Sequence, residues 1–303
     1  MQIYRTDQFP LPLPAGHRFP AEKYALLASA VETIAAGQMA TAPAATPAEL
    51  ALAHDTDYIQ AMFDGSIAPA LMREIGLPWS AALVERSARS TGATIAAARS
   101  ALLHGHGINL AGGTHHANCQ QGSGFCVFND VAVAIRVLQQ EGRIRRAAVI
   151  DLDVHQGNGT AAIFAGDASV FTLSLHGARN FPFRRSPSTL DVDLADDCGD
   201  VVYLAALAPA LAQLAANFVP DIVFYLAGAD PYQGDRLGRL QLSMAGLQAR
   251  DAQVLALCEA RQWPLAVVMA GGYAEPISDT VAIHLNTVRA VLACQPGSCA
   301  NPR

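Results

Sequence analysis

Three ionisable side chains stand at intervals of two residues in the stretch AAVIDLDVHQGNGT, residues 147–160. Asp151, Asp153 and His155 close a short apolar run of the kind that forms a buried parallel strand. Because side chains two residues apart on an extended chain point to the same side, two carboxylates and an imidazole should converge where this strand meets a glycine-rich loop. Open α/β sheets bind their ligands at that edge. Oxygen and nitrogen donors of this kind suit zinc, which in catalytic sites takes three protein ligands and leaves a position for water.

The best candidate for a third ligand is Asp230. This residue ends the apolar run 221–229, and Pro231 stops the strand directly after it. The set Asp153, His155 and Asp230 contains two carboxylates, so it carries less positive charge than a three-histidine zinc site. Zinc or iron(II) suits this set best, and manganese stays open.

A tandem histidine pair, His115 and His116, follows the letters AGGT. Adjacent side chains in an extended loop face apart, but the two glycines allow a turn that brings both imidazoles to one place. With Asp151 and Asn158 as partners, the pair can take a proton from water and give one to a leaving amine. Tyr273 follows two further glycines and is placed to donate to a developing oxyanion, and loss of such a donor costs about 3 to 4 kcal/mol.

The elements that position these residues alternate in type along the chain. Short apolar strands and amphipathic helices take turns from Gly107 onward, which predicts right-handed βαβ crossovers and a parallel sheet with helices on both faces. The carboxyl ends of parallel strands meet at one edge, so the polar residues that follow the strands should share a single site. We expect strands over 108–111, 147–151, 170–175, 222–227 and 265–270, and helices over 21–36, 80–103, 130–141, 203–218, 243–261 and 277–293, with one further helix starting near Thr46.

Both ends of the chain and one internal stretch are expected to be irregular. Prolines punctuate residues 1–20, which predicts a surface arm. Residues 65–79 are expected to form a long loop, and residues 294–303 a mobile tail. We find no linker and no internal repeat, so the chain is expected to form one domain.

The composition limits the partners and the location. The 303 residues are 51% hydrophobic and 15% charged, with a formal net charge of −6, so nucleic acid is a poor partner. The acidic balance gives weak support to a cationic substrate. We identify no uncharged stretch as long as a span of about 18 residues, and we expect no membrane partner.

The N-terminus lacks the features of a signal peptide, so a cytoplasmic protein is the default expectation. The six cysteines are scattered and are expected to be reduced thiols. The high apolar content leaves room for an oligomer.

Taken together, these blocks resemble the histone deacetylase family. They occur in the order and spacing of that family over about residues 15–290, and the segments 73–80 and 180–185 look most like bacterial members grouped near class IV. The matching blocks are Gly112 to Ala117, Gly122 to Asp130, Asp151 to Thr160, Ser174 to His176, Gly228 to Gly238 and Gly271 to Tyr273.

The resemblance implies an arginase/deacetylase fold, with one deacetylase-like catalytic domain over residues 1–303 and its active site at the carboxyl ends of the strands. It implies hydrolysis of an N-acyl-lysine or a related N-acyl amine, with an acetyl or longer acyl group, at a divalent metal that is usually zinc. Carried over onto this sequence, the implied metal ligands are Asp153, His155 and Asp230, the acid/base pair is His115 and His116, and the group that polarises the acyl carbonyl is Tyr273.

The resemblance also implies a substrate tunnel and a structural cation. The tunnel would consist of Gly124, Phe125, one of Phe181 and Phe183, Leu237 and Gly271. The K⁺ or Na⁺ site would consist of the Asp151 side chain, Ser174, and the main-chain oxygens of Asp153, His155 and Leu175.

Three positions depart from the family pattern. Asn158 stands where class I members carry Asp, Gln156 where they often carry a second His, and Ala270 replaces the first of three glycines. A neutral amide orients an imidazole without favouring its charged form, so the two histidines should differ more in basicity. The 65–79 stretch does not match the class I rim, which leaves acyl length and amine identity open.

Several patterns have plainer explanations. The glycine pairs at 122–124 and 157–159 complete no nucleotide-binding motif, and Cys119 and Cys126 lack an activating arrangement for a thiol hydrolase. The main alternative from another class is a module that binds acylated amines at the same metal pocket without turnover. A lone histidine is more often structural than catalytic, which we expect for His17, His54, His104, His106 and His284, whereas His176 is expected beside the site.

Overall fold

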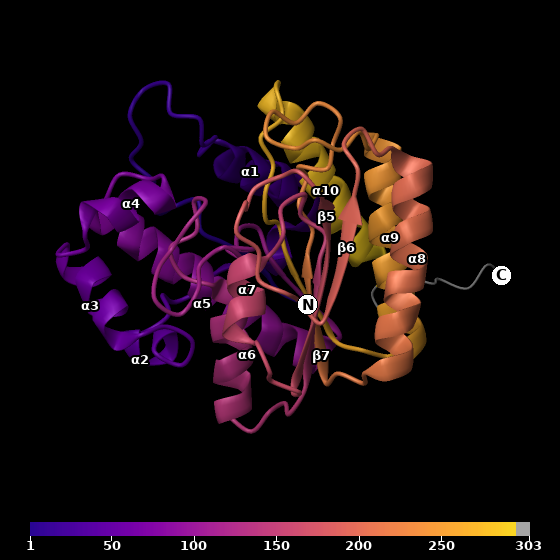
Figure 1. Cartoon of the computed structure of the whole chain (residues 1–303), viewed down its shortest axis with the longest axis horizontal. Helices are drawn as coiled ribbons and strands as arrows, with labels where there is room; N and C mark the ends of the chain where they lie inside the picture. The colour runs from indigo at the N-terminus through magenta and orange to yellow at the C-terminus, as the bar shows by residue number, and fades with distance from the viewer. Residues whose placement is uncertain (295–303) are drawn as a thin grey trace.

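A sheet of eight parallel strands runs through the middle of the computed structural model, which describes residues 1–294 (Figure 1). The strand order is β2-β1-β3-β8-β7-β4-β5-β6, so the predicted α/β class with a parallel sheet is confirmed. The strands are β1 (Ile3–Arg5), β2 (Met39–Thr41), β3 (His106–Asn109), β4 (Ala147–Asp151), β5 (Val170–Gly177), β6 (Leu190–Leu194), β7 (Ile222–Leu226) and β8 (Leu265–Val268).

Helices cover both faces of this sheet. In Figure 1, α8 and α9 lie on one side of the strands and α5, α6 and α7 on the other. The helices are α1 (Lys23–Ala35), α2 (Pro47–Leu50), α3 (Thr56–Asp64), α4 (Pro69–Ile75), α5 (Ala81–His104), α6 (Asp130–Gln140), α7 (Asn158–Ile163), α8 (Asp200–Asn217), α9 (Met244–Arg261) and α10 (Ile277–Ala293), with a 3₁₀ turn over Ala36–Gln38.

Strand β4 shows why the site-bearing strands are apolar throughout. Ala148 and Ile150 pack into the cluster that includes α8, α9 and α10, whereas Ala147 and Val149 pack into the cluster that includes α5 and α6. All four side chains are buried, and full burial of a Val or Ile side chain contributes about 1.5–3 kcal/mol. The strand that ends in Asp151 is therefore held firmly from both sides.

The N-terminal signals of two helices are confirmed. Thr46 forms a capping box with Glu49 at the start of α2, and the Ser80 side chain accepts a hydrogen bond from the Leu83 N–H at the start of α5. Both caps satisfy N–H groups that have no partner within the helix.

The structure differs from the sequence-based expectations at several edges. Residues 3–5 of the expected arm form β1, which lies between β2 and β3, and β2 and β6 were also not predicted. The stretch 65–79, expected to be a loop, contains α4, which begins with Pro69 and ends at Gly76 in the left-handed region. Of the expected tail 294–303, all but Cys294 lies outside the described residues.

Helix α8 corrects the expectation that no uncharged stretch reaches the length of a membrane span, because residues 201–220 carry no charged side chain. By length and composition alone it is the one helix among residues 1–294 that could span a membrane. Tyr203, Leu207 and Leu214 of this helix are nevertheless buried in the core cluster beside the sheet. Core helices of soluble proteins can have the same length and composition.

The fully buried Arg250 of α9 ties the ends of β4 and β7 together. Its guanidinium donates to the main-chain oxygens of Gly228 (2.6 Å) and Leu152 (3.3 Å) and pairs with Asp251 at 2.8 Å. Asp251 in turn accepts hydrogen bonds from the hydroxyls of Tyr225 and Thr287. These contacts fix the two loops that carry the predicted metal ligands.

Candidate functional site

The loops after β3, β4, β7 and β8 meet at the carboxyl edge of the sheet. They line one pocket of about 560 Å³, and all of the predicted tunnel residues border it. The residues that line it include His115, His116, Gly124, Phe125, Asp153, His155, Phe181, Phe183, Leu237, Gly271 and Tyr273.

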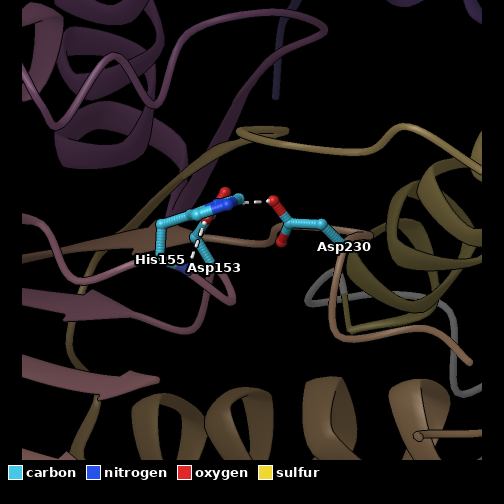
Figure 2. Close-up of side chains that lie close together, drawn as sticks. All are labelled: Asp153, His155 and Asp230. Carbon is cyan, nitrogen blue, oxygen red and sulfur yellow. Dashed lines mark hydrogen bonds and ion pairs between the residues drawn. The ribbon is translucent and has the colours of Figure 1, made fainter. Parts of the chain in front are cut away.

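Asp153, His155 and Asp230 form a compact group of three possible metal-binding side chains. One donor atom from each lies within 4.8 Å of the others, and all three residues are buried. His155 Nδ1 lies 2.9 Å from Asp153 Oδ1 and 3.2 Å from Asp230 Oδ2, so the imidazole and the two carboxylates point toward one another (Figure 2). Asp230 Oδ2 accepts no hydrogen bond from the described residues. This buried carboxylate oxygen therefore lacks a hydrogen-bond donor and lies beside two other possible metal-ligand atoms. Such an arrangement fits a bound cation.

The electrostatics of this group favour positive charge. Burial, followed by the neighbouring charge of Asp153, raises the pKa of Asp230 to about 7. Burial acts to lower the pKa of His155, but Asp153 and Asp230 outweigh it and raise that pKa to about 10. Both shifts arise because negative charge is concentrated in a dry site, which a divalent cation would neutralise.

Backbone amides hold the two carboxylates from behind. The Gly271 N–H donates to Asp153 Oδ2 at 2.8 Å, and the Val154 N–H donates to Asp230 Oδ1 at 2.9 Å. A Cβ on Gly271 would lie 2.0 Å from Asp230 Oδ2 and 2.6 Å from Asp153 Oδ2. Residue 271 must therefore be glycine for the backbone to approach both carboxylates.

The two tandem histidines face the same pocket with different partners. Their ring centroids are 4.1 Å apart. His115 Nδ1 lies 2.6 Å from Asp151 Oδ2, whereas His116 Nδ1 lies 2.9 Å from Asn158 Oδ1. The turn that the glycines allow is therefore present, and both predicted partners are in contact.

This difference in partners gives the histidines opposite pKa shifts. Burial opposes a charge on His115, but Asp151 and Asp153 outweigh it and raise its pKa to about 9. Burial, followed by the charges of His115 and His155, lowers the pKa of His116 well below its usual value. One imidazole thus favours the charged form and the other the neutral form.

Tyr273 also lines the pocket, and its hydroxyl keeps its proton. Burial, followed by the charges of Asp230 and Asp153, raises its pKa well above the usual value. Its N–H donates to Asp235 Oδ2 at 2.6 Å, and its ring lies 6.0 Å from that of Phe125. The protonated hydroxyl is available as a donor beside the carboxylate group.

Of the two candidate phenylalanines, Phe181 lies beside the site. Its ring centroid is 4.9 Å from that of His116 and 6.4 Å from that of His155. Phe183 is 87% exposed and borders only the outer part of the pocket. Gly124 allows this packing, because a Cβ there would lie 2.6 Å from His116 and 2.9 Å from Phe181.

Sequence reasoning missed the residues that hold these loops. Asp130 accepts hydrogen bonds from the N–H groups of Gly113 and Thr114, just before the histidine pair. Asp235 accepts from the N–H groups of Leu237 and Gly238 as well as from Tyr273. In each case the only sequence feature that could have indicated this role was an aspartate within one of the segments that resemble the family.

Lys23 is a second group that the sequence did not reveal. It is buried, and its ammonium donates to the main-chain oxygens of Gly272 at 3.3 Å and Ala270 at 3.5 Å. The same nitrogen lies 5.1 Å from the centre of the Tyr273 ring. It therefore supports the loop after β8 from the side of α1.

Residues of the expected cation site are neighbours in the sheet. Asp151 of β4 pairs in register with Ser174 of β5, and Leu175 follows. The Ser174 hydroxyl lies 2.9 Å from His176 Nδ1, so His176 borders the expected cation site, but it is not among the residues that line the pocket. Burial raises the pKa of Cys126 and of Cys119, which leaves neither thiol activated.

Comparisons with known proteins agree with this arrangement. A model of the histone deacetylase domain matches residues 17–288. An uncharacterized protein from Picosynechococcus sp. is 44% identical over 285 residues, which cover 93% of this chain and 95% of that protein. Histone deacetylase 2 of Arabidopsis thaliana is 35% identical over 197 residues, which cover 64% of this chain and 51% of that protein.

Among solved structures, the crystal structure of an HDAC homolog complexed with SAHA has a TM-score of 0.83 at 26% identity. The match covers 97% of this chain and 84% of that chain. Family model, sequence relatives and fold thus point the same way, and the chain belongs to the histone deacetylase family of hydrolases.

Proposed function

We propose that this protein is a metal-dependent deacylase that removes an acetyl or longer acyl group from N-acyl-lysine or a related N-acyl amine. One observation carries the proposal: two histidines, a tyrosine and two members of a three-residue metal-binding group line one pocket, and the third member, Asp230, lies directly beside them. Zinc is the first candidate for the metal, because two carboxylates and an imidazole are among its ligands. Family membership supports hydrolysis, and the acyl-lysine class is our extension of it.

Asp153, His155 and Asp230 would hold the metal, which when bound supplies Lewis-acid activation of water and of the acyl carbonyl. His116 has a neutral amide partner, so it can accept a proton from water and release it to the departing amine. His115 is paired with a carboxylate, which stabilises its imidazolium beside the reacting groups. The Tyr273 hydroxyl donates to the oxyanion that forms on the acyl carbon.

Gly124, Phe125, Phe181, Leu237 and Gly271 would surround the acylated side chain. Phe125 lines the pocket, and its ring centroid lies 5.2 Å from that of Phe19. Apolar walls on both sides suit the methylene stem of a lysine or a polyamine. We also propose that a K⁺ or Na⁺ ion is bound by Asp151 and Ser174 with the main-chain oxygen of Leu175, which the β4–β5 register supports.

The test is amine release from a panel of acetyl-lysine peptide, long-chain acyl-lysine peptide and acetylated polyamines. We expect turnover that a chelator abolishes and zinc restores. Stoichiometric metal with no turnover of any substrate would contradict the proposal and favour a module that binds acylated amines without hydrolysing them. The preferred substrate would identify the amine and the acyl length.

A further inference from the structure

Four arginines border the mouth of the pocket. Arg18, Arg73, Arg179 and Arg239 line its outer part and are exposed, and the one acidic residue that lines this outer part is Glu74. The other carboxylate of the lining, Asp153, lies at the floor. A substrate that enters the pocket must therefore pass a mouth in which positive side chains outnumber negative ones.

The positive charge of the mouth is only partly neutralised by the protein. Arg179 and Arg239 share a single carboxylate, Asp196, at 3.6 Å and 3.0 Å. Arg18 lies over the Phe125 ring at 5.1 Å, and within residues 1–294 neither it nor Arg73 forms an ion pair. At least two guanidinium groups thus keep donors available for a ligand.

The segments that carry these arginines are fixed by main-chain and amide contacts. The buried Asn180 donates from its side chain to Leu237 O at 2.8 Å and accepts from the Arg239 N–H at 3.3 Å. On the other side, the Gly124 N–H donates to Glu74 O at 3.0 Å. Arg179 and Arg239 therefore extend from anchored turns, and Arg73 extends from the last turn of α4, next to an anchored residue.

This local charge is opposite to that of the whole chain. The formal net charge of −6 suggested a weak preference for cationic substrates, but exposed charges are screened beyond about 8–10 Å at physiological salt. A ligand at the mouth therefore interacts mainly with the nearby arginines. Fields of one sign at a cleft attract ligands of the opposite charge and speed their association.

We propose that the four arginines select acylated amines that carry carboxylates next to the acylated side chain, such as an acyl-lysine flanked by Asp or Glu. Lysine-rich peptides and polyamines are disfavoured. The inference rests on the proposed deacylase function and defines its substrate class. Guanidinium groups bind carboxylates through paired hydrogen bonds. The preference therefore depends on the geometry of the carboxylate as well as on its charge.

The test compares acetyl-lysine peptides of equal length that are flanked by Asp, by Gly or by Lys. We expect kcat/KM to be about tenfold higher for the Asp peptide than for the Lys peptide at low salt, and the ratio to fall as salt is raised. Free Nε-acetyl-lysine and its α-amide form a second pair. A preference for the free carboxylate there but none among the peptides would assign the site to small acidic amines.

The test variant is the double substitution Arg73→Glu/Arg239→Glu at the mouth. Its control is Arg143→Glu/Arg145→Glu, which makes the same change of net charge in the loop between α6 and β4. The mouth variant should lose or reverse the Asp preference, and the second should keep it. If the double charge reversal unfolds, Arg73→Gln and Arg239→Gln should each reduce the ratio.

Two outcomes would count against these ideas in distinguishable ways. Turnover of the Gly peptide with no Asp preference among the peptides, and with no preference for free Nε-acetyl-lysine over its α-amide, would overturn the selectivity and leave the deacylase function intact. No turnover of any peptide by the metal-loaded protein would overturn the proposed function and the selectivity together.

Discussion

The floor and the mouth of the pocket are built in different ways. The floor consists of buried side chains at strand ends, and hydrogen bonds from backbone amides and partner side chains fix the positions of its carboxylates and imidazoles. The mouth consists of exposed arginines from four separate parts of the chain, with Arg73 at the end of α4 and the other three on irregular segments. On our proposals, the strand ends supply the chemistry, whereas the arginine-bearing segments select the molecule that reaches it.

The strongest test of the floor removes a metal ligand. Asp153→Ala should reduce kcat/KM by at least about 10³-fold, because the metal site loses a carboxylate and the remaining donors no longer surround the cation. Activity and bound metal should be measured together, with the exposed Asp64→Asn as the control. Near-normal turnover with little bound metal would show that the floor does not work as described.

Tyr273→Phe should lower kcat by about 10²–10³-fold and leave KM nearly unchanged, because the lost donor acts on the oxyanion and less on the bound substrate. Bound metal should be the same as in the unmodified protein. Tyr232→Phe, which removes a hydroxyl that contacts Asp279 away from the histidines, is the control. An equal loss in both variants would contradict a specific role for Tyr273.

Gly271→Ala tests how closely the backbone must approach the carboxylates. The added Cβ would lie 2.0 Å from Asp230 Oδ2, so the loop or the carboxylate must shift. We expect metal affinity to fall about 10–100-fold, as for groups that orient metal ligands. Gly37→Ala is the matched control, because a Cβ there meets nothing within 4 Å. Unchanged affinity in both variants would show that the floor is less rigid than the contacts suggest.

Asn158→Asp should change the pH profile more than the maximal rate. A carboxylate 2.9 Å from His116 Nδ1 would favour the imidazolium, and so raise a pKa that burial and the charges of His115 and His155 now hold low. A group with a raised pKa keeps its proton to higher pH, so the limb of the kcat profile due to His116 should move up by about one unit or more. Asn217→Asp on α8 is the control. If the kcat profile of Asn158→Asp is identical to that of the unmodified protein, His116 does not carry out the rate-limiting proton transfer.

The floor could be predicted because its residues lie next to strand signals. Asp153, His155 and Asp230 follow apolar runs, and parallel strands end at one edge, so their meeting follows from sequence spacing and topology. The choice between Phe181 and Phe183 could not be made, since both follow the same strand and only packing against His116 separates them.

The mouth could not be predicted, because no periodic pattern connects Arg18, Arg73, Arg179 and Arg239. They come together only in the folded chain. The negative net charge of the chain also suggested a preference for cationic substrates, whereas the charge at the mouth is positive. Strands β1 and β2 could not be predicted for another reason: three residues are too few to show an alternating pattern of apolar and polar side chains. The supporting roles of Asp130 and Asp235 depend on backbone amides, which carry no signature in the sequence.

The position of β8 determines when the sheet can assemble during synthesis of the chain. It is the last strand along the described chain, yet it lies between β3 and β7 in the middle of the sheet. Until residues 265–268 have emerged from the ribosome, no strand joins β1–β3 to β4–β7, and Gly271 and Tyr273 are absent from the pocket. A nascent chain therefore holds all three proposed metal ligands and both histidines before it has an assembled active site. Its sheet closes by a late, long-range step of the kind that slows folding.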